Sequence, residues 1–364
     1  MKIAFVINKI ENGGAEHILI NFLIELSLVN PALTLIVLSS QNQDESMLAK
    51  LKDSAVRVIQ LSMGSIYNPF LVFKLRAYFL SLRPDIIHVH LFPSIYWSFF
   101  ANSFLKKKSK LVFTEHSTVN RRIKNRFLKW VEIYIYAGYD LIIAISPFVY
   151  NNLILFVKPH NIVVIPNGIH LKEFQQATKT PIENLSLNIP ADSTVLLMTA
   201  RFEYPKNQAS AIRLCHLLPD NYYFLFAGLG SQLVQCQQLA ERLNIGHRVK
   251  FLGLRNDVAV LMKSVNINLL ISEYEGLSTA TIESMASEQV FLGSNIPGIS
   301  DVVGSSDSLF LNNDLDSLSR YVVEVSGDSR LRKSIVSKNI LKSLDFDISI
   351  MIASHLNVYQ RLLI

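Results

Sequence analysis

The chain has 364 residues, too many for one ordinary hydrophobic core, so two domains of roughly 150–200 residues are expected. Half of the residues are hydrophobic and 18% are charged, a composition that excludes a disordered protein. The formal net charge of +6 is uneven, since residues 1–180 carry +9 and residues 181–364 carry −3.

The first half of the chain alternates short apolar runs with amphipathic stretches such as residues 15–29. Continuous apolar runs of this length are typical of parallel strands buried on both faces. In chain order, the strands predicted in this half are 3–8, 34–39, 56–61, 85–90, 110–116, 141–146 and 162–166.

A second series of the same kind follows the Pro-Asn-Gly turn at 166–168 and a polar stretch at 170–192. Its predicted strands are 195–200, 222–227, 249–253, 267–272 and 290–294. Two βαβ series predict an α/β protein with two doubly wound, Rossmann-like domains. The predicted divisions are an N-terminal domain at 1–171, a C-terminal domain at 172–345 and a C-terminal helix at 346–364, which could pack back on the N-terminal domain.

A basic segment lies at 106–130, where nine of the Lys and Arg residues occur with Glu115 as the only acid. Its later part mixes bases with apolar side chains such as Phe127 and Trp130 at helical spacing. This pattern suits an anionic membrane surface. A solvated helix face and a patch for a phosphate-bearing acceptor are the alternatives. Nucleic acid is not expected as a partner, because no recognition module accompanies the charge.

The segment 272–287 follows a predicted strand, turns at Gly276 and begins a helix near Ser278. The first amides of a helix are unpaired and carry partial positive charge, so a diphosphate can bind there. The expected donor-binding residues of this turn are Gly276, Leu277, Ser278 and Thr279. Glu275 before the helix and Glu283 on it could accept hydrogen bonds from a sugar and a ribose. A solvated helix residue is the alternative for Glu283.

Arg201 and Lys206 follow another predicted strand. Two cations at this place would stabilise the charge that grows on a departing nucleotide diphosphate. A surface ion pair with Glu203 is the alternative. Gly13 and Gly14, which precede the first helix, would let backbone amides approach a phosphate or sugar closely, unless they only form a tight turn.

Gly228 and Gly230 form a further strand-to-helix turn, for which close packing is as good an explanation as ligand contact. We expect His88 and His90, at the end of another strand, to be half-buried structural residues.

The spacing Glu275-x7-Glu283, with Gly276-Leu277 and Ile282-Glu-Ser-Met-Ala286, resembles the motif of retaining glycosyltransferase family 4, which has the GT-B fold. Further similar motifs occur in the same order along nearly the whole chain: Gly13-Gly-Ala-Glu16, Thr114-Glu-His116, Ile165-Pro-Asn-Gly-Ile169, Ala200-Arg201 with Lys206, Ala227-Gly-Leu-Gly230 and Phe251-Leu-Gly253. The sequence departs from the family at His17, where Arg is common, and at Ser287-Glu-Gln-Val290, where the family often has Gly-x-Pro-Val.

This resemblance implies two domains that face each other across a cleft, with the donor on 195–295 and the acceptor on the N-terminal domain. It implies that His116 lies beneath the donor sugar, with a capping histidine as the alternative. The catalytic residues implied are His116, Glu275, Arg201 and Lys206.

The implied activity is retaining transfer of a hexosyl or N-acetylhexosaminyl group from a nucleotide diphosphate, with a UDP-sugar expected ahead of GDP-mannose. The implied acceptor is a lipid-linked saccharide in bacterial surface-polysaccharide assembly, such as O-antigen or capsule. The alternatives are a nucleotide-sugar epimerase on the same fold and a non-catalytic partner that binds sugar nucleotides.

Two Asp-x-Asp sequences, Asp314-Leu-Asp316 and Asp345-Phe-Asp347, have the form that binds divalent metals in other glycosyltransferases. Neither follows an apolar strand, and Asp314 and Asp316 are expected to open a helix. We therefore expect no metal ion and no cofactor.

The two cysteines, Cys215 and Cys236, lack metal-type spacing and are expected to be free thiols in a reducing compartment. The first residues lack a signal-peptide cleavage site, and Asp140 and Pro147 interrupt the most apolar region, 133–157. The expected location is the cytoplasm, with peripheral attachment to the inner face of the membrane.

Overall fold

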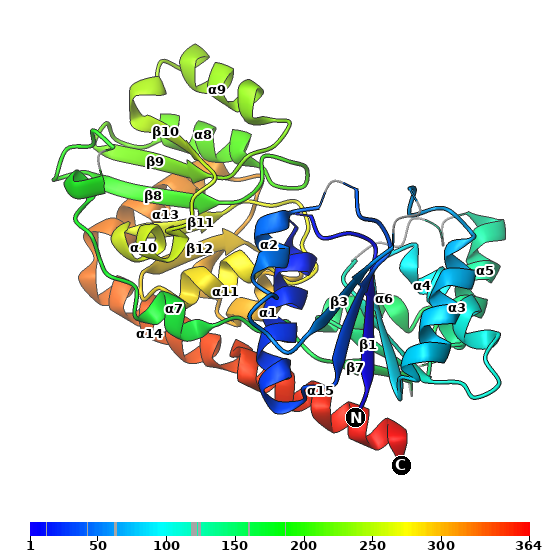
Figure 1. The fold of residues 1–364 in the computed structure, drawn as a ribbon. Coiled ribbons are helices and arrows are strands. Elements are labelled where there is room, and N and C mark those ends of the chain that lie inside the picture. The colour runs from blue at the N-terminus through cyan, green and yellow to red at the C-terminus, as the bar shows by residue number, and fades with distance from the viewer. Residues whose placement is uncertain are drawn as a thin grey trace. The chain divides into compact units, whose positions relative to one another are not determined.

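The computed structural model describes residues 1–11, 13–41, 43–61, 64–117, 122, 125–158, 161–185 and 187–364 (Figure 1). The chain divides into two compact units. Unit 1 comprises Met1–Gly168 and Ile348–Ile364, and unit 2 comprises Ile169–Asp347. Each unit is built on one parallel sheet with helices packed against it, which confirms the predicted α/β class.

Unit 1 contains a seven-stranded sheet in the order β3-β2-β1-β4-β5-β6-β7. Its strands are β1 (Ile3–Ile7), β2 (Leu33–Val37), β3 (Arg57–Gln60), β4 (Ile86–His90), β5 (Lys110–Glu115), β6 (Leu141–Ala144) and β7 (Ile162–Val164). Its helices are α1 (Gly14–Val29), α2 (Glu45–Ala49), α3 (Leu71–Leu82), α4 (Ser94–Ser103), α5 (Arg126–Ala137), α6 (Pro147–Leu153) and α15 (Ile348–Leu363).

Both faces of this sheet are covered, with α1 on one side and α3, α4 and α5 on the other (Figure 1). All five residues of β1 are buried, and this burial on both faces is why the strand reads as an unbroken apolar run. The strand order reverses between β1 and β4, and ligands of doubly wound sheets bind outside the carboxyl ends of strands at such a point.

Unit 2 contains a six-stranded sheet in the order β10-β9-β8-β11-β12-β13. Its strands are β8 (Thr194–Thr199), β9 (Tyr222–Ala227), β10 (Val249–Gly253), β11 (Ile267–Leu270), β12 (Val290–Ser294) and β13 (Leu309–Phe310). Its helices are α7 (Leu171–Gln175), α8 (Gln208–Leu217), α9 (Leu233–Arg242), α10 (Val258–Ser264), α11 (Thr279–Ala286), α12 (Ser300–Val303), α13 (Leu315–Gly327) and α14 (Ser329–Ser343). The order reverses between β8 and β11, so the loops that leave these two neighbouring strands are the candidate site of unit 2.

The end of the chain returns to unit 1, where α15 packs against α1. Ile348, Met351 and Tyr359 of α15 belong to the same buried apolar cluster as β1 and α1. Asp314 caps α13 by accepting a hydrogen bond from the Ser317 amide at 2.9 Å, the role expected for it. Within the described ranges, no helix combines the length and hydropathy needed to cross a membrane.

Candidate active site

The loop after β8 and the segment after β11 are held together by backbone hydrogen bonds in unit 2. The Asn207 amide donates to the Ile271 carbonyl at 3.0 Å, and the Glu273 amide donates to the Pro205 carbonyl at 3.0 Å. An antiparallel bridge joins Lys206 to Ser272 between these bonds. Adjacent parallel strands therefore place Lys206 beside the residues that follow β11.

Lys206 and Glu275 form an ion pair through Nζ and Oε1, two of the residues predicted to act in catalysis. Their side chains are only 20% and 13% exposed, so the pair is partly withdrawn from water. A charge-assisted hydrogen bond in such a place fixes both side chains. Lys206 can present its remaining N–H groups to an anion, and the second Glu275 oxygen can accept a hydrogen bond.

Glu283 lies on α11 near the same pair. Although part of this residue remains exposed, burial raises the pKa of its carboxyl to about 7, and the charge of Glu173 adds to the rise while that of Lys206 opposes it. An ordinary solvated glutamate would not titrate near neutral pH. The structure therefore disfavours the simpler alternative for Glu283, and perturbed carboxyls of this kind are typical of functional sites.

The start of α11 differs in one respect from the expected phosphate-binding turn. Ser278 caps the helix by accepting from the Thr281 amide at 3.3 Å, but its own amide donates to the Gly298 carbonyl at 3.0 Å. This engaged amide is not available to a ligand, which corrects the expectation for Ser278. The amides of Gly276, Leu277 and Thr279 donate to no acceptor in the described part of the chain.

Gly298 explains how this turn is held. Its φ of +82° lies in the left-handed region, and a Cβ atom there would be 2.5 Å from the Glu275 carbonyl oxygen. The backbone of the Pro-Gly turn after β12 thus packs directly against Glu275. The sequence analysis did not connect Gly298 with the site, because it lies in a separate loop 23 positions after Glu275.

Arg201 is exposed after β8, and its predicted alternative partner is engaged elsewhere. The Glu203 carboxylate accepts from the Ser231 amide at 2.6 Å and from the Ser231 hydroxyl at 2.8 Å. The positive charge of Arg201 contributes to lowering the pKa of Glu203, after the hydrogen bonds from Ser231, but the structure records no ion pair between the two among the described residues. The Arg201 guanidinium can therefore still turn to an anion.

Gly228 has a φ of +146°, and a Cβ atom there would collide with the Ala200 carbonyl. Close packing, the alternative that the sequence left open, accounts for this glycine without a ligand. Gly230 is likewise packed against the backbone of Phe202.

In unit 1, Gly13 caps α1 and Gly14 is its first residue. The backbone at Gly13 is extended (φ −119°), and a Cβ atom at Gly14 would meet nothing within 4 Å. The Gly13 amide donates to the Glu11 carbonyl at 2.8 Å, and a Cβ atom at Gly13 would lie 2.3 Å from a carboxylate oxygen of Glu16. This local turn gives Gly13 a reason within the chain, and ligand contact at Gly13 and Gly14 stays a prediction.

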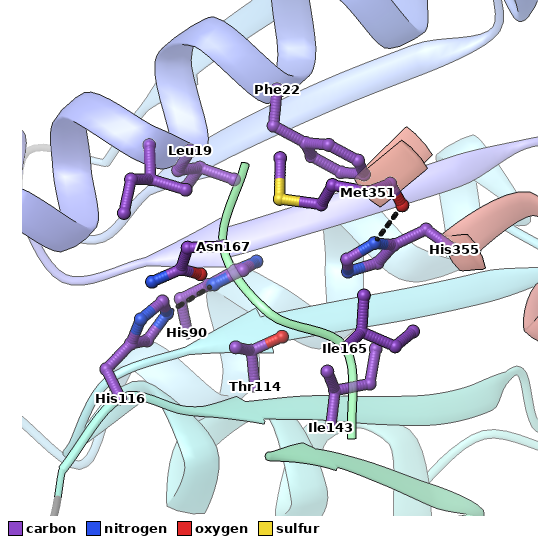
Figure 2. A pocket seen from close by; sticks show the side chains of 11 residues that line it. Leu19, Phe22, His90, Thr114, His116, Ile143, Ile165, Asn167, Met351 and His355 are labelled. Carbon is purple, nitrogen blue, oxygen red and sulfur yellow. Dashed lines mark hydrogen bonds between the residues drawn. The ribbon is translucent and has the colours of Figure 1, made fainter. Parts of the chain in front are cut away.

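His116 follows β5 and contacts His90 at the end of β4, with 3.1 Å between His116 Nε2 and His90 Nδ1. Figure 2 shows this contact in a small cavity of about 20 Å³, with Asn167 beside the two rings and His355 of α15 further along. Because Nε2 of His116 is occupied by His90, only Nδ1 can address a ligand.

His90 and His88 are fully buried, so the expectation of half-buried side chains was wrong. His88 contacts Tyr359 at 2.6 Å and Thr114 at 2.7 Å, and His355 Nδ1 contacts the Met351 carbonyl at 2.8 Å. Burial lowers the pKa of His116 and of His355 to about 4, and those of His88 and His90 well below the usual value. All four imidazoles are therefore neutral at pH 7.

The structure thus brings Lys206, Glu275 and Glu283 together in unit 2 and places His116 against His90 in unit 1.

Among the described residues, no three side chains of His, Cys, Asp or Glu are grouped to hold a metal ion. Of the predicted basic segment, residues 118–121 and 123–124 lie outside the described residues.

Two family models match this chain and together cover most of it. Residues 12–173 match the model described as Glycosyltransferase Family 4, and residues 181–341 match the model described as Glycosyl transferases group 1.

The curated relatives that are named as transferases include the following two. The first, the UDP-Gal:alpha-D-GlcNAc-diphosphoundecaprenol alpha-1,3-galactosyltransferase of Escherichia coli, is 31% identical over 195 residues, 51% of this chain and 50% of the relative. The chain thus aligns with about half the length of that protein. The second, from Campylobacter jejuni, is named GalNAc-alpha-(1->4)-GalNAc-alpha-(1->3)-diNAcBac-PP-undecaprenol alpha-1,4-N-acetyl-D-galactosaminyltransferase. It is 24% identical over 363 residues, 96% of this chain and 95% of the relative.

A solved structure of Anabaena HepE in complex with UDP and glucose superposes with a TM-score of 0.85 at 18% identity and covers 99% of both chains. At this level of identity the likeness describes the fold.

Proposed function

Because the chain belongs to glycosyltransferase family 4 and has its GT-B fold, we propose that it transfers a sugar from a nucleotide diphosphate to a lipid-linked saccharide. The Lys206–Glu275 pair carries the proposal, since it offers a cation to the leaving diphosphate beside a carboxylate for a sugar hydroxyl. Support for a UDP-sugar donor comes from the name of the Escherichia coli relative and from the UDP-bound fold neighbour. Diphospho-undecaprenol acceptors appear in the names of both relatives.

In the proposed retaining reaction, the bond between the anomeric carbon and the β-phosphate oxygen breaks while the acceptor oxygen bonds to the same face of that carbon. The acceptor hydroxyl proton passes to the departing phosphate. Lys206, Arg201 and the free amides of Gly276 and Leu277 stabilise the negative charge on that phosphate, so the proposal requires no metal ion. Glu275, held by Lys206, positions the sugar and forms no covalent bond. Trapping a glycosyl-enzyme on Glu275 would overturn this mechanism.

The test is a thermal-shift panel of UDP, GDP and their sugars, each with and without EDTA. A nucleotide that binds the native state must raise the melting temperature, and we expect UDP and a UDP-sugar to do so. The shift should persist in EDTA. Loss of the shift in EDTA contradicts metal independence, and the absence of a shift with every nucleotide contradicts the donor site. Release of free epimer from the donor alone would identify an epimerase instead.

We also propose that unit 1 attaches to an anionic bilayer through an aromatic–basic face. The residues proposed for it lie on or next to α3, α4 and α5, which cover one side of the sheet (Figure 1). Its aromatic members, each more than half exposed, are Tyr67, Phe70, Phe73, Phe104, Trp130 and Tyr134. Its basic members, all exposed, are Lys106, Lys107, Lys108 and Lys129.

Exposed aromatic rings with lysines among them suit the boundary between headgroups and acyl chains, where the rings are buried and the lysines meet anionic lipid. The lysines of the basic segment would also suit a helix face exposed to water. The exposed aromatic rings on α3 and α5 favour the membrane, because apolar rings exposed to water are unfavourable unless they bind a partner or a bilayer.

The membrane proposal predicts that the protein floats with vesicles containing phosphatidylglycerol and much less with pure phosphatidylcholine. The double variant Phe70→Ser/Phe73→Ser should weaken vesicle binding by about tenfold or more, since two inserted rings are lost. Leu341→Ser is the matched control, because Leu341 is 71% exposed on α14 of unit 2. Undiminished binding of the double variant, or equal loss in the control, would refute the assignment.

A further inference from the structure

A groove of about 480 Å³ lies in unit 2, lined by residues of α8, α9 and the loop that contains Lys206. This volume falls within the range of about 300–1,000 Å³ that is usual for small-ligand sites. Lys206, which was assigned to the departing diphosphate, is one of its lining residues, whereas Arg201 and the start of α11 are not. The rest of the lining, on α8 and α9, has no part in the proposed transfer and needs its own explanation.

One face of α9 lines the groove over about ten residues, a length of about 15 Å. The lining residues recur at helical spacing and are Gln232, Gln235, Cys236, Leu239 and Arg242. A helix face that packed on a core would be apolar throughout. Here glutamine and arginine alternate with the two apolar positions, so this face is suited to a polar ligand.

Two arginines give the groove its charge. Arg213 of α8 and Arg242 of α9 are exposed, and neither forms a hydrogen bond or ion pair with any residue that the structure describes. By contrast, Arg255 of the same unit forms two hydrogen bonds with Asp257. The acid that lines the groove, Glu273, accepts a hydrogen bond from Asn207 at 2.8 Å. The unengaged charge in the groove is therefore positive.

The remaining lining residues favour a sugar. Tyr204 is 62% exposed and is held edge-on against Tyr274, with 5.5 Å between the ring centres, so its ring offers a flat apolar surface. Glutamine amides both donate and accept, as hydroxyl groups require, and the guanidinium fork fits a carboxylate or phosphate. We propose that the groove binds a saccharide that carries an anionic group. This binding is additional to the transfer reaction and does not depend on it.

The test measures binding by calorimetry to the purified full chain. The probes are a glucuronate-containing tetrasaccharide, glucose 1-phosphate and neutral maltotetraose. We expect at least one of the two anionic probes to bind about tenfold or more tightly than maltotetraose. A preference for one of them identifies the anionic group as carboxylate or phosphate. The double variant Arg213→Gln/Arg242→Gln should abolish the preference, since it removes both cations but keeps polar side chains.

The matched control is Arg330→Gln, which removes an exposed arginine from α14. It should bind as the unaltered protein does. Equal affinity for neutral and anionic probes, or full binding by a correctly melting double variant, would overturn the proposal. None of these outcomes bears on sugar transfer, so the two proposals can fail separately.

Discussion

Lys206→Ala is expected to lower kcat/KM for sugar transfer by about 100- to 1,000-fold, the usual loss when one preorganised donor to a developing anion is removed. The variant also leaves Glu275 without its cation, in a site where that side chain is only 13% exposed. An unpaired carboxylate there would repel the departing diphosphate. Steady-state kinetics with a UDP-sugar and a lipid-linked acceptor measure the loss.

Lys263→Ala is the matched control for this variant. Lys263 forms an ion pair with Glu288 in the same unit, and its side chain is 11% exposed, as withdrawn from water as that of Lys206, although Glu288 is 44% exposed. Glu288 follows the C-terminal end of α11 and lies outside the proposed site. The control should therefore retain its kcat/KM. Equal complementation in cells by Lys206→Ala and the unaltered protein would instead support a non-catalytic sugar-nucleotide-binding protein.

Unit 1 is expected to lose stability as the pH falls from about 6.5 to about 4. The folded state holds neutral imidazoles whose pKa values are lowered by burial, so the unfolded state binds protons first. Stability is then fully present above the unfolded pKa and falls by about 1.4 kcal/mol per pH unit for each histidine. For His355, with a pKa of about 4, the loss approaches about 3 kcal/mol. Glu115, whose pKa is raised by burial, opposes this trend with a single carboxyl.

Urea unfolding at a series of pH values, followed by tryptophan fluorescence, measures the stability of unit 1. The signal reports on this unit because the two tryptophans, Trp97 and Trp130, both lie in it. His355→Gln should weaken the dependence of the unfolding free energy on pH. The glutamine amide can still donate to the Met351 carbonyl but does not titrate. His216→Gln, at an exposed position of α8, should leave that dependence unchanged. The same slope in all three proteins would contradict the buried-imidazole explanation.

The fold was predictable because strands buried on both faces leave an uninterrupted apolar pattern. All twelve predicted strands occur, with ends that differ by one or two residues in most cases. β13 was missed, since Leu309–Phe310 is too short to form such a pattern. The ends of strands also indicated where Lys206 and Glu275 would lie, because β8 and β11 are followed by the loops that carry them.

The finer contacts of the site depend on residues far apart in the sequence. His90 meets His116 because β4 and β5 pair with His90 opposite Thr114, a register that no local pattern reveals. The Ser278 amide is engaged by Gly298, which comes from a different loop. His88 reaches Tyr359 across 271 positions of the chain. The repeated His at positions 88 and 90 was the one local sign of this cluster, and the structural role expected for both stays a prediction.

The return of α15 has a consequence for synthesis of the protein. Unit 2 is one continuous stretch, whereas unit 1 is completed by a segment that is translated after all of unit 2. Until Ile348–Leu363 leave the ribosome, the core around β1 and α1 lacks Met351 and Tyr359, and the imidazoles lack His355. The amino-terminal unit, although made first, is therefore the later of the two to reach its native packing, which reverses the usual order of co-translational folding.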